Sequence, residues 1–186
     1  MPLTYSHARR PVGGPVTFAL DGDRLTVDSG RKVQDVRLGA VEQVRMTYES
    51  RGFSRRAFQT EVRMKDGKSF RFSSLHWKSV VEAERLDGPY RAFTRALLEA
   101  IAASNPEARF LAGRSRWMWG ATALLGGAAL AGMALFVFGA VRSGHTGAAL
   151  IGAAFLGLGI WQLEPMVRRN KPRRFAPDAR PAELLP

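Results

Sequence analysis

The sequence has no cysteine, which excludes disulfide frameworks, Cys-ligated zinc, iron–sulfur clusters and thiol nucleophiles. Histidine is almost as scarce: His7, His76 and His145 lie far apart, and no pair has the spacing of a helix-borne zinc site. A Gly-x-Ser-x-Gly nucleophile elbow is also absent, and nothing selects two carboxylates for acid–base chemistry. We therefore expect a protein that is not an enzyme, with no catalytic residues, no metal and no cofactor.

Acidic residues are few relative to basic ones. The chain has 28 Lys and Arg against 16 Asp and Glu, a formal net charge of +12. Such a balance suits either a nucleic acid or an anionic membrane surface as partner. The stretch before residue 117 shows neither a helix that begins with basic residues nor an obvious set of aromatic residues for stacking on bases. We therefore expect membrane lipids as a partner, and no nucleic acid.

Ionisable side chains are missing from Trp117 to Val141. A helix of this length measures roughly 37 Å, more than the ~30 Å hydrocarbon core of a bilayer. A polar break at residues 142–145 precedes a second apolar run, from Gly147 to Leu163. The sequence therefore predicts a transmembrane hairpin of two helices over residues 117–167. A hairpin buried in a soluble helical bundle is the alternative, which the Gly- and Ala-rich composition and the charged flanks disfavour.

The charges that flank the two spans predict their orientation. Arg109, Arg114 and Arg116 precede the first span and several basic residues follow the second, whereas the connecting turn has only Arg142. Both termini are therefore expected in the cytoplasm, with the spans in a bacterial inner (plasma) membrane. The residues expected to anchor the spans at the membrane interface are Trp117, Trp119, Trp161, Arg168 and Arg169.

Small residues recur at four-residue spacing in both spans, and such rows let helices approach closely in lipid. The rows contain Ala123, Gly127, Ala131, Ala128 and Gly132 in the first span, and Ala149, Ala153 and Gly157 in the second. Two interpretations stay open: the rows pack the hairpin on itself, or they dock on a second copy or another membrane protein. A two-helix hairpin has more small faces than it can use internally, so a partner is expected.

Before the spans, short runs of alternating apolar and polar residues predict strands separated by tight turns. The strands are expected over residues 16–20, 24–28, 33–38, 41–48, 58–64 and 69–73. In the run 41–48 the expected inward positions are Val41, Val44, Met46 and Tyr48. Residues 75–83 fit either a seventh strand or a short helix.

A helix is expected after the strands, from about Pro89 to the stop at Asn105-Pro106. Apolar residues at helical spacing define one face: Tyr90, Phe93, Leu97, Leu98 and Ile101. We expect this face to close the core of the predicted sheet. A helix that lies on the membrane surface is the alternative.

The order and spacing of these elements resemble the bacterial pleckstrin-homology-like domains that are attached to membrane spans. The resemblance covers about residues 14–103 and rests on the segments Phe18-x-Leu20-x-Gly22-Asp23-x-Leu25, Val36-Arg37-Leu38-x-x-Val41-x-x-Val44, Asp66-Gly67 and Tyr90-x-x-Phe93. It implies an α+β fold, a small β-barrel or sheet capped by one helix, and a binding or assembly module.

The expected domain organisation follows from these elements. It comprises an N-terminal extension (1–14), the pleckstrin-homology-like domain (15–104), a linker (105–116), the hairpin (117–167) and a basic, Pro-rich cytoplasmic tail (168–186). The tail is expected to run extended along the membrane or over a partner, with Leu184-Leu185-Pro186 as a candidate docking segment. Glu164, near the end of the second span, is expected to pair with Arg168 one helical turn away.

Between the two longest predicted strands, three arginines surround one phenylalanine. Arg51, Arg55 and Arg56 can meet lipid phosphates while Phe53 enters the membrane interface, so these four residues are the candidate lipid-headgroup contacts. A solvated hairpin whose charges deter edge pairing is the alternative.

These features predict a non-enzymatic inner-membrane protein whose cytoplasmic domain mediates protein assembly, or acts as an accessory subunit or regulator of a membrane complex. A membrane-surface module that senses anionic lipid is the alternative, and part of an oligomeric transporter is a weaker third. The expected partners are membrane lipids together with a membrane protein or a second copy of the chain.

Overall fold

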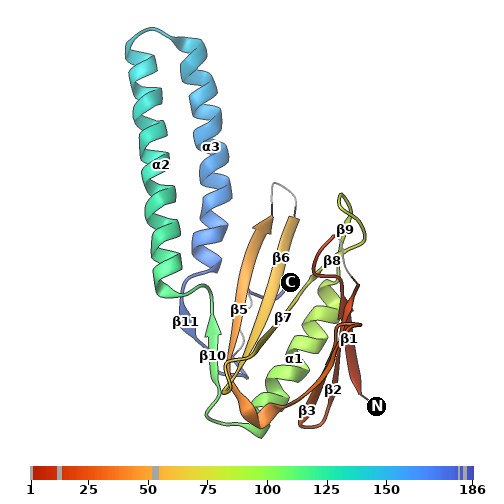
Figure 1. The fold of residues 1–186 in the computed structure, drawn as a ribbon. Helices are drawn as coiled ribbons and strands as arrows, with labels where there is room; N and C mark the ends of the chain where they lie inside the picture. The colour runs from red at the N-terminus through yellow and green to blue at the C-terminus, as the bar shows by residue number, and fades with distance from the viewer. Residues whose placement is uncertain (1, 12–13, 52–54, 180, 182–183) are drawn as a thin grey trace. The chain divides into compact units, whose positions relative to one another are not determined.

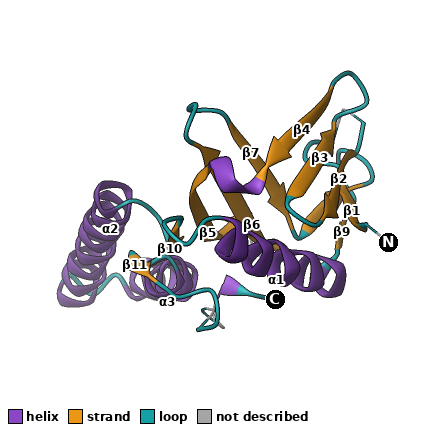
Figure 2. Ribbon diagram, turned by 90° about the horizontal axis from the view of Figure 1, so that it is seen from below, coloured by secondary structure: helices purple, strands orange, loops and turns teal. Residues whose placement is uncertain are grey.

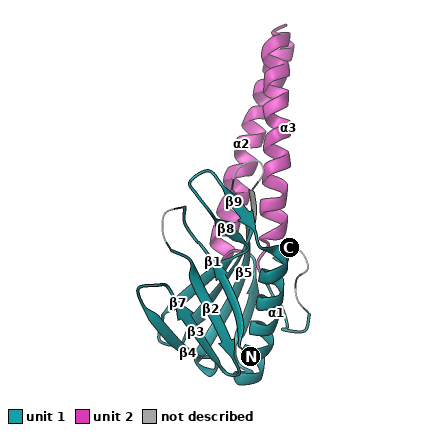
Figure 3. Cartoon of the chain, turned by 90° about the vertical axis from the view of Figure 1, so that its right-hand side faces the viewer, with its two compact units in different colours: residues 1–113, 173–186 teal, residues 114–172 magenta. Residues whose placement is uncertain are grey.

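The computed structural model describes residues 2–11, 14–51, 55–179, 181 and 184–186. The chain divides into two compact units, which Figure 3 distinguishes by colour: residues 1–113 with 173–186, and residues 114–172. The first unit consists mainly of β-strands, with a long helix, and the second consists of two long helices. The protein is therefore a mixed α+β chain whose apolar helices are inserted between two segments of one β-rich unit.

A four-stranded antiparallel sheet begins the first unit (Figure 1). Its strands, in spatial order, are β1 (Leu3–His7), β2 (Val16–Asp21), β3 (Arg24–Asp28) and β4 (Val33–Arg37). Side chains alternate between the two faces of each strand, and Phe18, Leu20, Leu25 and Val27 are buried. Gly22 has a φ of 57° in the turn between β2 and β3, a conformation that only glycine adopts freely. The three strands predicted here are confirmed.

The second sheet has the order β11-β10-β5-β6-β7. Its long antiparallel strands are β5 (Val41–Arg51), β6 (Arg55–Met64) and β7 (Ser69–Ser73), which match the remaining three predicted strands. The short 3-10 helix η1 (Leu38–Ala40) joins β4 to β5. A register shift near the start of β5 changes its phase. Because of this shift, all four expected inward residues of β5 are buried: Val41, Val44, Met46 and Tyr48.

Helix α1 (Asp87–Ser104) packs across the strands of the first unit (Figure 2). All five residues of its predicted apolar face are buried, so this face closes the β-sheet core and does not lie on a membrane. Inside the core, a hydrogen bond of 2.7 Å joins the hydroxyls of Tyr90 on α1 and Thr60 on β6. A buried hydroxyl without a partner is costly, so this bond specifies how α1 is seated on the sheet.

Aromatic rings fill the centre of this core. Neighbouring rings lie 5.3 to 6.2 Å apart, and they belong to Tyr5, Phe18, Phe72, Tyr90 and Phe93. They come from β1, β2, β7 and α1, so both sheets and the helix share one core. All but one of these pairs are tilted or edge-to-face, and Tyr5 stacks on Phe93; such pairs add to the free energy gained from burial alone.

Between β7 and α1 the chain forms a small hairpin, β8 (Leu75–Trp77) and β9 (Ala83–Arg85), where the sequence fitted either a strand or a short helix. Leu75 is buried. At the base of the hairpin the backbone N–H of Leu86 donates to the carbonyl of Ser74 (2.7 Å). The hairpin is therefore attached to the body of the unit.

Three segments expected outside the domain contribute strands to the first unit, which includes residues 1–14, 105–113 and 173–186 of them. The expected extension 1–14 contains β1. The expected linker 105–116 contains β10 (Arg109–Ala112), which pairs in parallel with β5. The expected tail 168–186 contains β11 (Arg173–Arg174), which pairs antiparallel with β10. Each strand is too short to show a clear period, and each is held by a partner strand.

The C-terminal segment packs on its own chain instead of running extended over a membrane or a partner. The ring of Phe175 lies 5.9 Å from that of Phe110, and the backbone N–H of Phe175 donates to the Phe110 carbonyl (3.1 Å). Leu184 is only 1% exposed, and Leu185 packs against the same core. These candidate docking residues therefore contact the first unit itself.

The second unit is a helical hairpin of α2 (Arg116–Arg142) and α3 (Thr146–Arg169). Both helices are long and apolar enough to cross a membrane. The side chain of Ser115 caps α2 by accepting from the backbone N–H of Met118 (3.4 Å). The less exposed positions of α2 after residue 122 recur with spacings of three and four: 123, 126, 130, 133, 137 and 140. This is the heptad pattern of two helices packed side by side.

Candidate functional site

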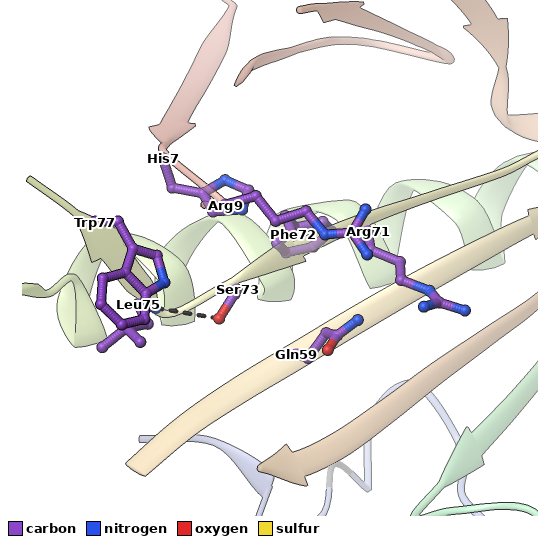
Figure 4. Close-up of a pocket in the computed structure, with 8 residues that line it drawn as sticks. All are labelled: His7, Arg9, Gln59, Arg71, Phe72, Ser73, Leu75 and Trp77. Carbon is purple, nitrogen blue, oxygen red and sulfur yellow. Dashed lines mark hydrogen bonds between the residues drawn. The ribbon is translucent and has the colours of Figure 1, made fainter. Parts of the chain in front are cut away.

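A small cavity of about 20 Å³ lies where β1, β7 and β8 meet in the first unit (Figure 4). Its lining comprises His7, Arg9, Gln59, Arg71, Phe72, Ser73, Leu75 and Trp77. In Figure 4 the side chains of Arg9 and Arg71 extend in the same direction, away from Trp77. One side of the cavity is therefore cationic and the other is aromatic and apolar.

One backbone–backbone hydrogen bond and two between side chain and backbone hold the three elements around this cavity. The N–H of Ala8 donates to Nδ1 of His76 (3.0 Å), and the N–H of Trp77 donates to the carbonyl of Ala8 (3.1 Å). The hydroxyl of Tyr5 donates to the carbonyl of Ser73 (2.6 Å). These bonds join the end of β1 to β7 and β8, which are about 70 residues away along the chain.

Among the residues that line this cavity, His7 is the one whose pKa clearly departs from its ordinary value. It is fully buried, and its ring stacks on Tyr5 (5.7 Å) and Phe18 (5.9 Å). Burial is the largest cause that lowers the pKa of His7 to about 4, and the positive charges of the neighbouring His76 and Arg9 act in the same direction. Neither ring nitrogen has a hydrogen-bond partner among the residues that the structure describes. His7 is therefore neutral at pH 7.

The chemistry available to this cavity is limited by its size. About 20 Å³ is room for about one water molecule, far below the volume of an organic substrate site. The guanidinium of Arg71 is already paired with the carboxylate of Glu61 (2.9 Å). We conclude that the cavity belongs to the packing of the unit and offers no catalytic arrangement.

A wider groove of about 400 Å³ opens between β4 and the turn that joins β6 to β7. Its lining includes the apolar residues Val27, Val36 and Phe70, and also Lys68 and Asp66, which form an ion pair (2.6 Å). The hydrogen bonds from Lys68 hold the pKa of Asp66 below its ordinary value. Over the described ranges of the chain, no group of three potential metal-ligating side chains occurs.

The predicted lipid-headgroup residues lie at the end of the β5–β6 hairpin. The backbone of Arg51 pairs with that of Arg55, and Ser50 pairs with Arg56. Phe53 lies outside the described residues. The structure therefore brings the backbones of the three arginines together at one hairpin end, and their contact with lipid stays a prediction.

The small residues of the spans divide into two groups. A Cβ added at Gly126 would lie 2.6 Å from Leu163, one at Gly159 would lie 2.8 Å from Leu130, and one at Gly152 would lie 2.8 Å from Val137. These glycines let α2 and α3 approach each other, and none of them is in the predicted rows. Of the predicted residues, Ala149 is buried and Ala123 is half-buried.

The rest of the predicted rows face away from the hairpin. In the described part of the chain nothing lies within 4 Å of a Cβ added at Gly127, Gly132 or Gly157. Ala128, Ala131 and Ala153 are exposed as well. The interpretation that the rows pack the hairpin on itself is therefore wrong for these six residues.

The predicted interface anchors have different surroundings in the second unit. Trp117 and Trp161 are exposed, whereas the indole N–H of Trp119 donates to the carbonyl of Val167 (2.8 Å). The expected pair between Arg168 and Glu164 is confirmed, at 2.8 Å. Arg169 is the last residue of α3. The helix continues through Pro165, so this ion pair has the i,i+4 geometry of a regular turn.

Comparison with protein-family models, with curated proteins and with solved structures finds no match to this chain. Functional inference therefore rests on its own residues. Sequence reasoning missed the burial of His7 and Leu184 and the exposed tip of the β8–β9 hairpin. The only available signal for the tip was the pair Val80-Val81 between polar residues, in a segment whose structure the sequence left open.

Proposed function

We propose that this chain is a non-enzymatic, two-span membrane protein whose spans bind a second copy or another membrane protein, so that it acts as an assembly or accessory subunit. The proposal rests on the different surroundings of the glycines in the two spans. Three of them are used where α2 meets α3, while Gly127, Gly132 and Gly157 are open to the surroundings. Small residues on an open helix face let another helix approach closely. The van der Waals packing that results is one of the forces that drive helix association in lipid.

The first unit fits this role as a pleckstrin-homology-like module. Support comes from the strand order: a four-stranded antiparallel sheet, then three antiparallel strands, then a helix that closes the core. The additions are the β8–β9 hairpin and the strands β10 and β11, which flank the inserted spans. Because β10 and β11 pair with each other, the two connections to the spans start from neighbouring strands.

Bulky residues on the open faces test the assembly proposal. In the double variant Gly127→Leu/Gly157→Leu, we expect self-association or partner binding to weaken at least about tenfold, or about 1.4 kcal/mol. The reason is that two leucines keep a neighbouring helix away. The measurement is particle mass and co-purifying chains after extraction in mild detergent, followed by dilution in nanodiscs.

Two further variants make this test specific. Gly147→Leu is the matched control, because it also has open space around an added Cβ but lies outside the predicted rows; it should assemble normally. Gly126→Leu should disturb the hairpin itself through its clash with Leu163. A wild-type particle that is a lone monomer in native membranes refutes the proposal.

We also propose that both termini are cytoplasmic. Because the chain has no cysteine, a single introduced cysteine reports its own side of the membrane, and no native residue of the chain contributes thiol labelling. In intact cells, a membrane-impermeant maleimide is expected to react with Ser143→Cys, in the turn between the spans, and to react with Lys32→Cys, at an exposed turn of the β-rich unit, only after permeabilisation. The reverse pattern contradicts this orientation.

A further inference from the structure

We propose that the outward face of the second sheet is a docking surface for an acidic segment of a protein partner. Five arginines share this face, which we call the arginine face: Arg45, Arg63, Arg71, Arg109 and Arg174. The inference goes beyond the assembly proposal and does not rest on it. That proposal concerns the two spans, whereas this one concerns the β-rich unit alone, so either can fail without the other.

The two faces of the second sheet differ in chemistry. Side chains alternate between the faces along each strand. One set of positions is buried in the core that α1 closes, and it comprises Val44, Met46, Val62, Phe72 and Phe110. The alternate positions lie on the other face, where Arg45 is half-buried and the other four arginines are exposed. The arginines are therefore presented outward by a sheet whose opposite face is fixed in the core.

Strand register arranges these arginines in two rows across the sheet. The first row passes through directly paired residues of all five strands, in the order Arg174, Leu111, Arg45, Glu61 and Arg71. The second row passes through Arg109, Gln43, Arg63 and Ser69. Neighbouring strands lie about 4.8 Å apart, so the arginines within a row recur about every 10 Å. The rows combine strands that are distant in the sequence, so local patterns do not reveal them.

Nearby acidic residues neutralise only part of this charge. The carboxylate of Glu61 pairs with the guanidinium of Arg71 (2.9 Å), and that of Glu42 pairs with Arg109. Five arginines against these two glutamates leave a formal excess of three positive charges on the arginine face. An anionic partner is therefore complementary to it.

The remaining guanidiniums lie close to one another. Arg63 is placed diagonally across the strand pair from Arg45. Burial is the largest cause of the lowered pKa of Arg45; Glu61 opposes this shift and the positive charge of Arg63 adds to it. Neither Arg63 nor Arg174 has an ion pair with another residue that the structure describes. A carboxylate at this face would therefore be attracted by more than one arginine.

The mixed charges of the face favour a polypeptide over a uniform polyanion. Guanidiniums bind carboxylates and phosphates alike, but Glu42 and Glu61 stand among the arginines, and Glu49 lies farther along β5 on the same face. A nucleic acid would bring phosphates close to these carboxylates, and no position of the two rows carries an aromatic side chain for stacking on a base. A protein segment can place carboxylates opposite the arginines and uncharged side chains opposite the glutamates.

An acidic helix fits the spacing of the two rows. Residues seven apart on an α-helix share one face and lie about 10.5 Å apart, close to the distance of about 10 Å between arginines of one row. The probe for the test is therefore a helical peptide with glutamate at every seventh position in an otherwise uncharged sequence rich in Ala and Gln.

The test uses the full-length protein in nanodiscs of phosphatidylcholine, a lipid without net charge. An environment-sensitive fluorophore is attached to Ser69→Cys, an exposed and uncharged position of the second row. The matched control carries the fluorophore at Thr4→Cys, an exposed position of β1 in the four-stranded sheet. Because the natural chain has no cysteine, each protein carries one label. The peptide is then titrated at low salt.

We expect the peptide to change the signal at position 69 in a saturable way and to leave the signal at position 4 unchanged. In the variant Arg63→Gln/Arg174→Gln, the apparent Kd should rise about fivefold or more, because two unpaired guanidiniums are lost. Arg24→Gln/Arg37→Gln is the matched control: it removes the same charge from exposed positions of the four-stranded sheet and should change the Kd less than about twofold. All four positions are exposed, so both variants should keep the exchange protection of the core strands.

Several outcomes overturn the proposal. Equal weakening in the two double variants shows that net charge alone explains the binding. Absence of a saturable change at position 69, or tighter binding there of a duplex DNA of equal charge, excludes an acidic polypeptide as the preferred occupant. A change at position 69 without peptide, when phosphatidylglycerol replaces part of the phosphatidylcholine, identifies the bilayer as the occupant and overturns the proposal as well.

Discussion

Leu184→Ala is expected to destabilise the β-rich unit by about 2–4 kcal/mol, although this residue follows both apolar helices in the sequence. Leu184 is 1% exposed and belongs to the same core as the sheets and α1. Removal of a buried leucine side chain loses its transfer free energy and leaves a cavity. The measurement is hydrogen exchange of the β5 and β10 amides in the full-length protein in nanodiscs.

Two further variants define what the C-terminal segment contributes. Truncation after Pro172 removes β11, Phe175 and Leu184 together, so it should lower protection of β10 and its neighbours more than Leu184→Ala does. Leu185→Ala is the matched control, because Leu185 is only half-buried and should cost less. Normal protection of β10 in the truncated protein would show that the segment is dispensable for the fold.

Acidification from pH 7 to about pH 4 is expected to destabilise the β-rich unit through His7. Burial lowers the pKa of His7 from 6.5 to about 4. Below pH 6.5 the unfolded chain therefore binds a proton that the folded chain excludes, so the free energy of unfolding falls as the pH falls. The full difference is on the order of 3 kcal/mol, reached as the pH approaches 4.

The variant His7→Phe isolates this effect. A phenylalanine can take the stacked position between Tyr5 and Phe18 and carries no proton, so the loss of stability between pH 7 and 4.5 should largely disappear. The groups that face His7 are His76 and Arg9. The exposed carboxyls of Asp66 and Glu84, whose pKa values are lowered by lysine partners, lose their pairing only at lower pH. His145→Phe, in the turn between α2 and α3, is the matched control, and an equal pH dependence in wild type and His7→Phe contradicts the expectation.

Strong local patterns account for the parts of the fold that were correctly predicted. Alternation in β2 and β3, the turn glycines Gly22 and Gly67 and the apolar stripe of α1 are all readable within about 20 residues. The two apolar helices follow from composition and length alone. Even the phase change in β5 was visible, because Val41 and Val44 break the alternation that Met46 and Tyr48 resume.

Rotation about a helix axis explains why the sequence could not decide between the two interpretations of the small-residue rows. Gly126 and Gly127 are adjacent, but neighbouring residues on an α-helix point about 100° apart. Only the packing of α2 on α3 decides that Gly126 faces Leu163 while Gly127 faces outward. Four-residue spacing shows that a helix has a face of small residues. It does not show which other helix packs against that face.

By itself, the sequence determined the class of this protein: a β-rich unit closed by one amphipathic helix, two apolar helices in a hairpin, and an excess of positive charge. The tertiary structure alone decided that residues 3–7, 109–112 and 173–174 join the sheets, that His7 and Leu184 are buried, and that Val80 and Val81 are held outward. The physical reason is that strand pairing and burial of these short segments depend on partners distant in the sequence. Their local composition carries little trace of such contacts.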